Sequence, residues 1–390
     1  DGAGIGSTLV GGSGNIFTVT ADNVLFQDMT LQDAAQGIRV DSVVDNLQID
    51  NLSFEGILSG AYGIEIHNSA VLTNLSVVNS FFSGTGGTGI RMASTAVADG
   101  IHVNNTEFDG LKNAINEASN NTVAGGHLRD LQVTNSTFQN ISDVSIYAED
   151  LRDSNISGNE FFGNPAGNGE RDIVLNNKYS ANGMAFGNIQ ITNNSFSNSD
   201  RPAIQLDSRA EALVGGVTIS GNSFDSDIST LTYSWTRIDV NLNSSYTHAP
   251  VAITDNSITF TGNSSAGSTG TSAISLSGGS DAITISGNTL TDNTTLGGYS
   301  TTGIAIITDN SFSGAISSTA VIDISNNFID GFDTAVLVYD SLAAEFGGLT
   351  AGAQINFNNN SVTGSTANIA SGAGAAVNAS NNWWGSNVEA

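Results

Sequence analysis

A short sequence pattern recurs along the whole chain and constrains the fold more than any other feature. Residues 189–198 read IQITNNSFSN, and the same order of aliphatic, Asn-containing and aromatic positions returns in LQIDNLSFEG at 47–56, LQVTNSTFQN at 131–140 and VTISGNSFDS at 217–226. The closing positions of fourteen copies are Leu31, Phe54, Phe82, Phe108, Phe138, Phe161, Phe196, Phe224, Ile258, Leu290, Phe312, Phe328, Val362 and Trp383. Their mean spacing of about 27 residues is typical of solenoids, propellers and arrays. The individual gaps vary, which disfavours helical repeats.

Each repeat also contains a second short run in which apolar and polar residues alternate. Examples are GIRV at 37–40, GIEI at 63–66, GIRM at 89–92, AIQL at 203–206 and RIDV at 237–240. A period of two indicates strands with one buried face. Because turns rich in Gly, Asn and Ser join these strands, we predict one all-β domain over residues 1–390. Its expected form is a parallel β-helix of about 14 coils, stacked at a strand spacing of ~4.8 Å.

The Asn residues of the pattern are expected at the bends between strands, because Asn tolerates a left-handed backbone and its amide both donates and accepts. Stacked amides would form a hydrogen-bonded ladder. One motif position holds Asn79, Asn105, Asn135 and Asn193. The next position holds Asn159, Asn222, Asn256, Asn288, Asn310, Asn326 and Asn360. The one-place offset between the two sets predicts a change in bend geometry near residue 158.

Essentially the whole chain resembles the right-handed parallel β-helix proteins of the pectate-lyase-like superfamily. The resemblance is in the short alternating runs such as GIRV and GIEI, called GI strands below, and in the I-x-x-N-x-F unit. Its last coil, VNASNNWWGS at 377–386, is similar to the terminal coil of secreted bacterial β-helix repeat proteins. The resemblance implies a right-handed solenoid and an extracellular, cell-surface location. The superfamily includes polysaccharide lyases and hydrolases, phage tailspikes and bacterial surface proteins, so the resemblance does not by itself decide the function. The chain opens with coil-like sequence, DGAGIGSTLVGG, so we expect an uncapped first coil.

The charge and composition of the chain exclude several classes of partner and site. There are 10 Lys and Arg against 37 Asp and Glu, a formal net charge of −27, which disfavours binding to nucleic acid. All basic residues lie between Arg39 and Arg237, so the C-terminal third offers no cations to an acidic glycan. The chain has no cysteine, which excludes disulfides and thiolate sites, and no apolar run indicates a transmembrane segment. We expect no metal site and no cofactor, with calcium left open by the many Asp and Asn residues at bends.

Outward-pointing side chains of the GI strands are the candidates for function, since enzymes of this fold bind substrate along a stacked face. The predicted binding residues are Arg39, Asp41, Glu65, His67, Arg91 and Gln205. Asp207 and Asp239 lie at diagonal positions of neighbouring coils, ~8 Å apart by backbone geometry. Paired carboxylates at that separation would suit the catalytic residues of inverting glycoside hydrolysis. A solvated surface ladder of alternating charges is the competing interpretation of the first five residues.

Two functions follow from these observations. The leading hypothesis is a non-catalytic extracellular β-helix, the structural or adhesive segment of a bacterial surface protein. Its partners would be further copies of itself in a fibre or an extracellular polysaccharide. This hypothesis depends on the uninterrupted repeat, the cation-free C-terminal third and the lack of the superfamily's catalytic motifs. The alternative is a polysaccharide-active enzyme, either a lyase or an inverting glycoside hydrolase, or a tailspike-like module that uses the outward face of coils one to eight.

Overall fold

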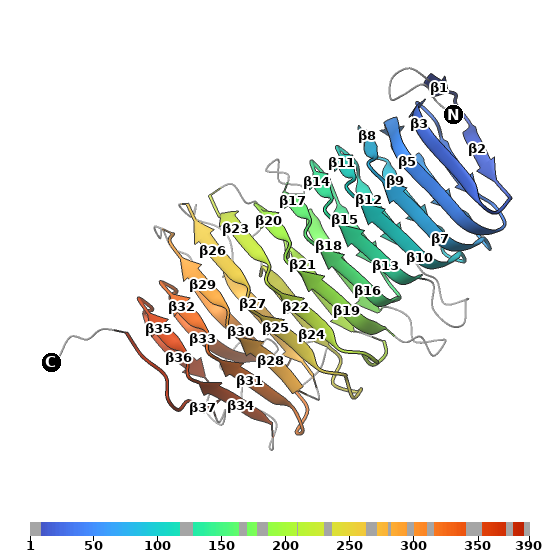
Figure 1. Ribbon diagram of the computed structural model, residues 1–390. Helices are drawn as coiled ribbons and strands as arrows, with labels where there is room; N and C mark the ends of the chain where they lie inside the picture. Colours follow the sequence, from blue (N-terminus) through green and yellow to red (C-terminus); the bar gives the residue numbers. More distant parts are fainter. Residues whose placement is uncertain are drawn as a thin grey trace. The chain divides into compact units, whose positions relative to one another are not determined.

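The computed structural model describes residues 9–117, 128–163, 170–177, 186–208, 210–229, 236–262, 271–279, 282–294, 300–309, 316–340, 353–371 and 377–385 (Figure 1). Every regular element in these ranges is a β-strand, as the sequence predicts. The contacts divide the chain into unit 1, Asp1–Gln190, and unit 2, Ile191–Ala390, which are described in turn. The described residues contain no helix that could cross a membrane.

Each unit builds two parallel sheets, A and B, from successive coils. In unit 1, sheet B contains β2 (Asn15–Val19), β4 (Gln36–Val40), β6 (Tyr62–Ile66), β9 (Thr88–Met92), β12 (Asn113–Glu117), β15 (Val144–Ala148) and β18 (Arg171–Asn177). Sheet A of unit 1 contains β1 (Leu9–Gly11), β3 (Val24–Gln32), β5 (Val43–Leu58), β7 (Val71–Val78), β8 (Phe81–Thr85), β10 (Val97–Asn104), β11 (Glu107–Asp109), β13 (Leu128–Thr134), β14 (Thr137–Gln139), β16 (Leu151–Ser157) and β17 (Glu160–Phe162). Strand β19 (Gly187–Thr192) includes the boundary between the units.

Unit 2 repeats this arrangement. Its sheet B contains β21 (Ile204–Ser208), β24 (Ile238–Leu242), β27 (Thr271–Gly278), β30 (Thr301–Asp309), β33 (Thr334–Asp340) and β36 (Ala367–Ser371). Its sheet A contains β20 (Ser195–Ser197), β22 (Val217–Ser220), β23 (Ser223–Asp227), β25 (Val251–Thr254), β26 (Ser257–Thr261), β28 (Ala282–Ser286), β29 (Thr289–Asp292), β31 (Val321–Ser325), β32 (Phe328–Asp330), β34 (Gln354–Asn358), β35 (Ser361–Thr363) and β37 (Val377–Asn378).

Strand pairing within each unit joins a strand to its equivalent in the next coil, so like residues stack on like. In unit 1, Ile38 pairs with Ile64 and Ile64 with Ile90. In unit 2, Ile204 pairs with Ile238. Because the side chains of a strand alternate between its two faces, this register buries one row and turns the next row outward. The predicted coil arrangement is therefore confirmed.

The closing residues of the sequence pattern form the interior stacks. In unit 1, Phe54, Phe82, Phe108, Phe138 and Phe161 stack with near-parallel rings whose centroids are 4.4 to 5.1 Å apart. In unit 2, Phe196 stacks on Phe224 at 4.7 Å. Two predicted positions are wrong. Ile329 pairs with Leu290 while Phe328 turns outward and is 40% exposed. Trp383 bridges to Ser361, the residue before Val362, and is 46% exposed. Phe312 lies outside the described residues.

The bend inside sheet A has one geometry in both units, and the predicted change near residue 158 is wrong. Its first residue has a left-handed backbone, with φ of 52° at Asn79, 66° at Gly158 and 67° at Gly221. Its second residue is buried, as Ser80 and Asn222 illustrate. The two Asn sets therefore occupy adjacent positions of the same bend. Gly and Asn are favoured at the first position because both tolerate positive φ.

The amides at the second position form the predicted ladder in unit 2, although its members differ in part from those predicted. The rungs are Asn194, Asn222, Asn256, Asn288, Asn327, Asn360 and Asn382, and each amide nitrogen donates to the amide oxygen of the next rung at 2.9 to 3.1 Å. Compared with the predicted second set, Asn194, Asn327 and Asn382 are added. Asn326 is removed, because its φ of 57° places it at the first position of its bend, where Asn193 lies as predicted. Asn310 lies outside the described residues. Since the backbone N–H of each rung also donates to the next amide oxygen, the ladder satisfies polar groups that burial would otherwise leave unmet.

The segment near the C-terminus forms the expected last coil. Strand β37 pairs with β34, and Trp383 bridges to Ser361. The ring of Trp384 lies 5.7 Å from that of Phe357. An uncapped first coil is predicted for residues that include 1–8, which lie outside the described part of the chain. The prediction of a single domain over residues 1–390 stays a prediction.

Candidate functional site

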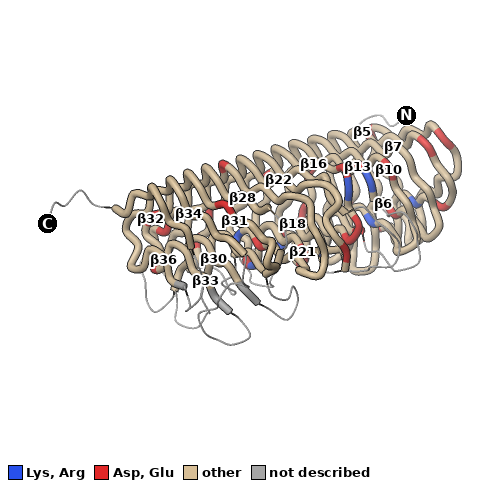
Figure 2. The backbone as a smooth tube through the Cα atoms, turned by 90° about the horizontal axis from the view of Figure 1, so that it is seen from below, with Lys and Arg blue, Asp and Glu red and all other residues tan. Residues whose placement is uncertain are grey.

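The outer face of sheet B presents a continuous row of side chains in each unit. In unit 1 successive pairs in register are Thr18 with Arg39, Arg39 with Glu65, Glu65 with Arg91, Arg91 with Asn116, and Asn116 with Tyr147. In unit 2 Gln205 pairs with Asp239 and Asp239 with Ser275. Lys and Arg occur only between Arg39 and Arg237, so the coils after Arg237 contain neither (Figure 2).

The predicted binding residues of the first coils do come together in unit 1. Glu65 accepts hydrogen bonds from Arg91 Nη1 at 2.6 Å and from His67 Nδ1 at 3.4 Å. Arg39 pairs with Asp41 at 2.9 Å, and the Arg91 guanidinium lies 4.6 Å from the centre of the Tyr62 ring. Because each cation lies against a carboxylate, this cluster largely neutralises itself. The arrangement matches a ladder of alternating charges.

Gln205, the remaining predicted binding residue, lies apart from this cluster. It lies in unit 2, where its Nε2 donates to Asp207 Oδ2 at 2.9 Å. Asp207 and Asp239 occupy the predicted diagonal positions, since Asp207 pairs with Asn241 and Asp239 with Gln205. These residues therefore form a second cluster on sheet B.

Asn241 joins the two carboxylates of this second cluster. Its Nδ2 donates to Asp207 Oδ1 at 2.8 Å and to Asp239 Oδ2 at 3.0 Å, and its own Oδ1 accepts from the Ser277 hydroxyl. As both oxygens lie within 3.0 Å of one nitrogen, they are at most about 6 Å apart. That separation is shorter than the ~6.5–9.5 Å of inverting glycosidases and closer to the ~5–5.5 Å of retaining ones. At these two oxygens the carboxylates are therefore closer than the predicted ~8 Å, and their catalytic role stays a prediction.

A third cluster was missed by the sequence pattern. Glu117 takes the inward position of β12, in register with Met92, which itself pairs with Ile66. Its side chain is buried, and Oε2 accepts the backbone N–H of Glu149 at 2.5 Å and of Asp150 at 3.3 Å. Burial, and then the negative charges of Asp150 and Glu149, raise the pKa of Glu117 to about 8.

Tyr147 extends this third cluster to the outer face of β15. Its hydroxyl donates to Glu149 Oε1, and burial together with that carboxylate raises the pKa of Tyr147 above its usual value. The available signal was in the sequence NAINE at 113–117, which places an acid where the preceding coils have an aliphatic residue. Neutral Glu117 is the form that this enclosed position favours.

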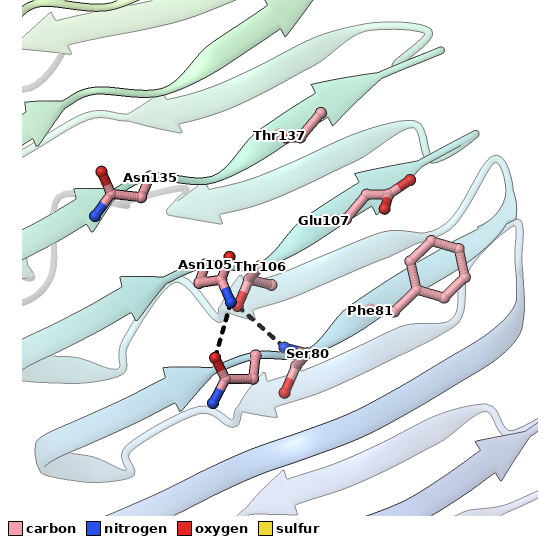
Figure 3. A pocket seen from close by; sticks show the side chains of 8 residues that line it. Ser80, Phe81, Asn105, Thr106, Glu107, Asn135 and Thr137 are labelled. Carbon is pink, nitrogen blue, oxygen red and sulfur yellow. Dashed lines mark hydrogen bonds between the residues drawn. The ribbon is translucent and has the colours of Figure 1, made fainter. Parts of the chain in front are cut away.

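A shallow pocket of about 250 Å³ lies at the bend of sheet A in unit 1 (Figure 3). One wall is formed by Asn79, Asn105 and Asn135, the left-handed residues of three successive bends. The other wall contains Phe81, Glu107 and Thr137, which are in register with one another. Asn105 Nδ2 donates to Asn79 Oδ1 at 2.8 Å.

Metal ligation finds no support in the part of the chain that the structure describes. No group of three or more His, Cys, Asp or Glu side chains there is arranged to hold an ion. Calcium binding and the expected absence of a cofactor stay predictions.

Comparison with known proteins agrees with this geometry. Residues 9–167 match the family described as the right handed beta helix region. Both units have the fold of a parallel β-helix, and the match over residues 9–167 is to its right-handed form. None of the curated proteins matches its sequence.

Three solved structures similar to this β-helix are crystal structures of DFA-IIIase from Arthrobacter chlorophenolicus A6. A mutant in complex with DFA-III has a TM-score of 0.40 and 11% identity, covering 82% of this chain and 83% of that chain. The mutant alone has a TM-score of 0.38 and 11% identity, with 81% and 82% covered. The complex with GF2 has a TM-score of 0.37 and 10% identity, with 82% of each chain covered.

Proposed function

We propose that the protein acts on a glycan at the outer face of sheet B in unit 2, with Asp207 and Asp239 as its paired carboxylates. The observation that carries this proposal is the single amide of Asn241 that binds both side chains. A fixed amide donor holds two like charges near each other, an arrangement that costs electrostatic energy and that glycoside hydrolysis uses. The polysaccharide-active alternative is thereby preferred to the non-catalytic one.

The separation of the carboxylates suggests the reaction class. With both oxygens on one amide nitrogen, the pair leaves little room for an intervening water and favours a retaining, two-step hydrolysis. Asp239 is the more exposed of the two, since Asp207 is 1% exposed. Asp239 is accordingly the carboxylate that meets the sugar first, while Asp207 is held beside it by the amides of Gln205 and Asn241.

The substrate is expected to be a neutral glycan. Residues 238–390 contain no Lys or Arg (Figure 2), and Arg237 is fully buried. An acidic polysaccharide would meet the carboxylate pair without compensating cations, which disfavours its binding. A lyase acting on uronates is therefore the weaker form of the enzyme hypothesis.

Activity assays on a panel of neutral and acidic glycans test this proposal. We expect release of reducing ends from a neutral glycan, loss of at least 100-fold in kcat for Asp207→Asn and Asp239→Asn, and a product that first appears with the anomeric configuration of the substrate. Asp323→Asn is the matched control, because Asp323 also accepts an Asn amide across one coil, from Asn356 at 2.7 Å, but on the exposed face of sheet A. An active protein whose rate is unchanged in both Asp variants would contradict the assignment.

A second candidate function is the non-catalytic one, a structural or adhesive segment outside the cell. The buried amide ladder of unit 2 supports it, because such a ladder stabilises a solenoid whether or not the surface has an activity. Extracellular location, and assembly with further copies or with polysaccharide, belong to this proposal. Electron microscopy of the native protein tests it, and dispersed particles without fibres or glycan attachment would count against it.

A further inference from the structure

The pocket in Figure 3 has the residues of a ligand site that is separate from both carboxylate clusters. We propose that it binds a neutral glycan chain that lies along the coil axis of unit 1, with Phe81 as the surface on which a sugar ring packs. None of its lining residues belongs to sheet B. The inference consequently does not depend on the hydrolytic function proposed for Asp207 and Asp239.

One wall of the pocket offers hydrogen-bonding groups at the spacing of the coils. Asn79 and Asn105 are exposed, and left-handed backbone at both, with φ of 52° and 49°, fixes them at the bend. Asn105 donates to Asn79, and Asn79 donates to Asp50 Oδ1 at 2.9 Å. Each amide thus uses one of its two N–H groups, and the oxygen of Asn105 accepts no bond from a described residue. These unused groups suit sugar hydroxyls, which both donate and accept.

The opposite wall adds an apolar surface next to polar ones. Phe81, Glu107 and Thr137 follow one another in successive coils, each as the outward residue directly after the buried bend position. Gln139 donates to Glu107 Oε1 at 2.6 Å, which fixes that carboxylate in the wall. An aromatic ring beside a few convergent polar groups is the usual composition of a small-molecule site. Three coils cover about 10 Å along the axis, roughly the length of two sugar rings.

The negative charge of the residues that line the pocket favours a neutral ligand. The lining residues include Glu107 and no Lys or Arg, and Asp50 adjoins the wall through Asn79. A uronate or a phosphate would face these carboxylates without a counter-charge. A neutral sugar instead places its C–H face on Phe81 and its hydroxyls on the amides.

Calorimetric titration of the full chain with cellotetraose and with tetragalacturonate tests the proposal. We expect cellotetraose to bind, tetragalacturonate to bind at least ten-fold more weakly, and Phe81→Ala to weaken cellotetraose binding at least ten-fold. Phe328→Ala is the matched control, because Phe328 is a phenylalanine at the same position after the bend and is 40% exposed, whereas Phe81 is half-buried. Phe328 belongs to unit 2. It should leave the affinity within two-fold of wild type.

A second variant covers the case in which Phe81→Ala alters folding. Thr137→Trp fills the groove from its outer wall, and it should abolish binding while the thermal unfolding temperature stays at the wild-type value. In the double variant Asp207→Asn/Asp239→Asn, Phe81→Ala should still weaken the remaining cellotetraose binding at least ten-fold, which separates this site from the proposed hydrolysis. Undetectable binding of cellotetraose, tighter binding of tetragalacturonate or of tetralysine, or unchanged affinity in a folded Phe81→Ala protein would each overturn the proposal.

Discussion

The carboxylate of Glu117 accepts the backbone N–H of Glu149 at 2.5 Å, so a buried side chain of one coil fastens the end of the sheet B strand in the next coil. Glu117 also accepts the N–H of Asp150, and both of these residues carry carboxylates of their own. The buried position has Met92 on one side in register. A proton on Glu117 removes a negative charge from this enclosed group of three acids.

The free energy of unfolding should depend on the protonation of Glu117. Its folded pKa of about 8 lies above the ordinary 4.5, so the stabilisation is complete below pH 4.5 and is lost as the pH rises towards 8. At about 1.4 kcal/mol per pKa unit, this change is on the order of 5 kcal/mol. Urea unfolding between pH 5 and 8 should show wild-type stability falling with pH, and a flatter dependence in Glu117→Gln.

The control for Glu117 is Glu107→Gln, which neutralises a carboxyl that lies on the outer wall of the pocket rather than in the interior. This variant should keep the wild-type slope. Glu117→Gln with the same slope as wild type would mean that the buried acid is not the group that titrates.

Removing one ring from the interior stack should be costly. Phe108 is fully buried between Phe82 at 4.9 Å and Phe138 at 5.1 Å. Phe108→Ala leaves a cavity that rigid neighbouring coils cannot close, and we expect a loss of ~3–5 kcal/mol in the free energy of unfolding. Phe162→Ala is the comparison, because Phe162 is 45% exposed, and it should change stability by less than ~1 kcal/mol. Equal losses in the two variants, measured by denaturant unfolding, would contradict the stacked core.

The Phe stack and the coil register could be predicted from the sequence because they depend on period alone. A strand period of two fixed which face Ile38 and Ile64 bury, and the recurrence of the same Gly-Ile run in successive repeats predicted which strands pair. The same reasoning fails where two similar residues are adjacent in the sequence. Asn326 and Asn327 are adjacent, as are Phe328 and Ile329, and a one-residue choice between similar side chains is decided by the neighbouring coils.

The candidate site was only partly predictable for a different reason. The diagonal placement of Asp207 and Asp239 follows from strand register. Their close approach depends on Asn241, whose rotamer places its amide between them and is not encoded in spacing. Glu117 escaped notice because NAINE alternates like any other strand, and only its stacking on Met92 shows that the acid faces inward.

Removing one side-chain amide from the ladder should destabilise unit 2. Asn256 donates to Asn288 and to the Ile219 carbonyl, and it accepts from Asn222. Asn256→Ala leaves buried partners on both sides unsatisfied, so we expect a loss of roughly 2–4 kcal/mol. Asn356→Ala, which removes a donor to Asp323 on the outer face, should cost less than ~1 kcal/mol. A small effect of Asn256→Ala in denaturant unfolding would show that water can replace the rung.

Glycine at the start of the sheet B strands is needed for close packing, and Gly63 provides the sharpest test. A Cβ atom there would lie 2.7 Å from Phe82 Cδ1 and 2.8 Å from the Gly89 carbonyl oxygen. Because that oxygen belongs to the next strand of the sheet, the backbone cannot yield without shifting the ladder, and Gly63→Ala should cost ~1–3 kcal/mol. Gly12→Ala adds its methyl to open space and should leave stability unchanged or slightly higher, since it restricts the unfolded chain. If thermal unfolding showed Gly63→Ala to be as stable as Gly12→Ala, Phe82 could not be packed against the backbone of β6 as described.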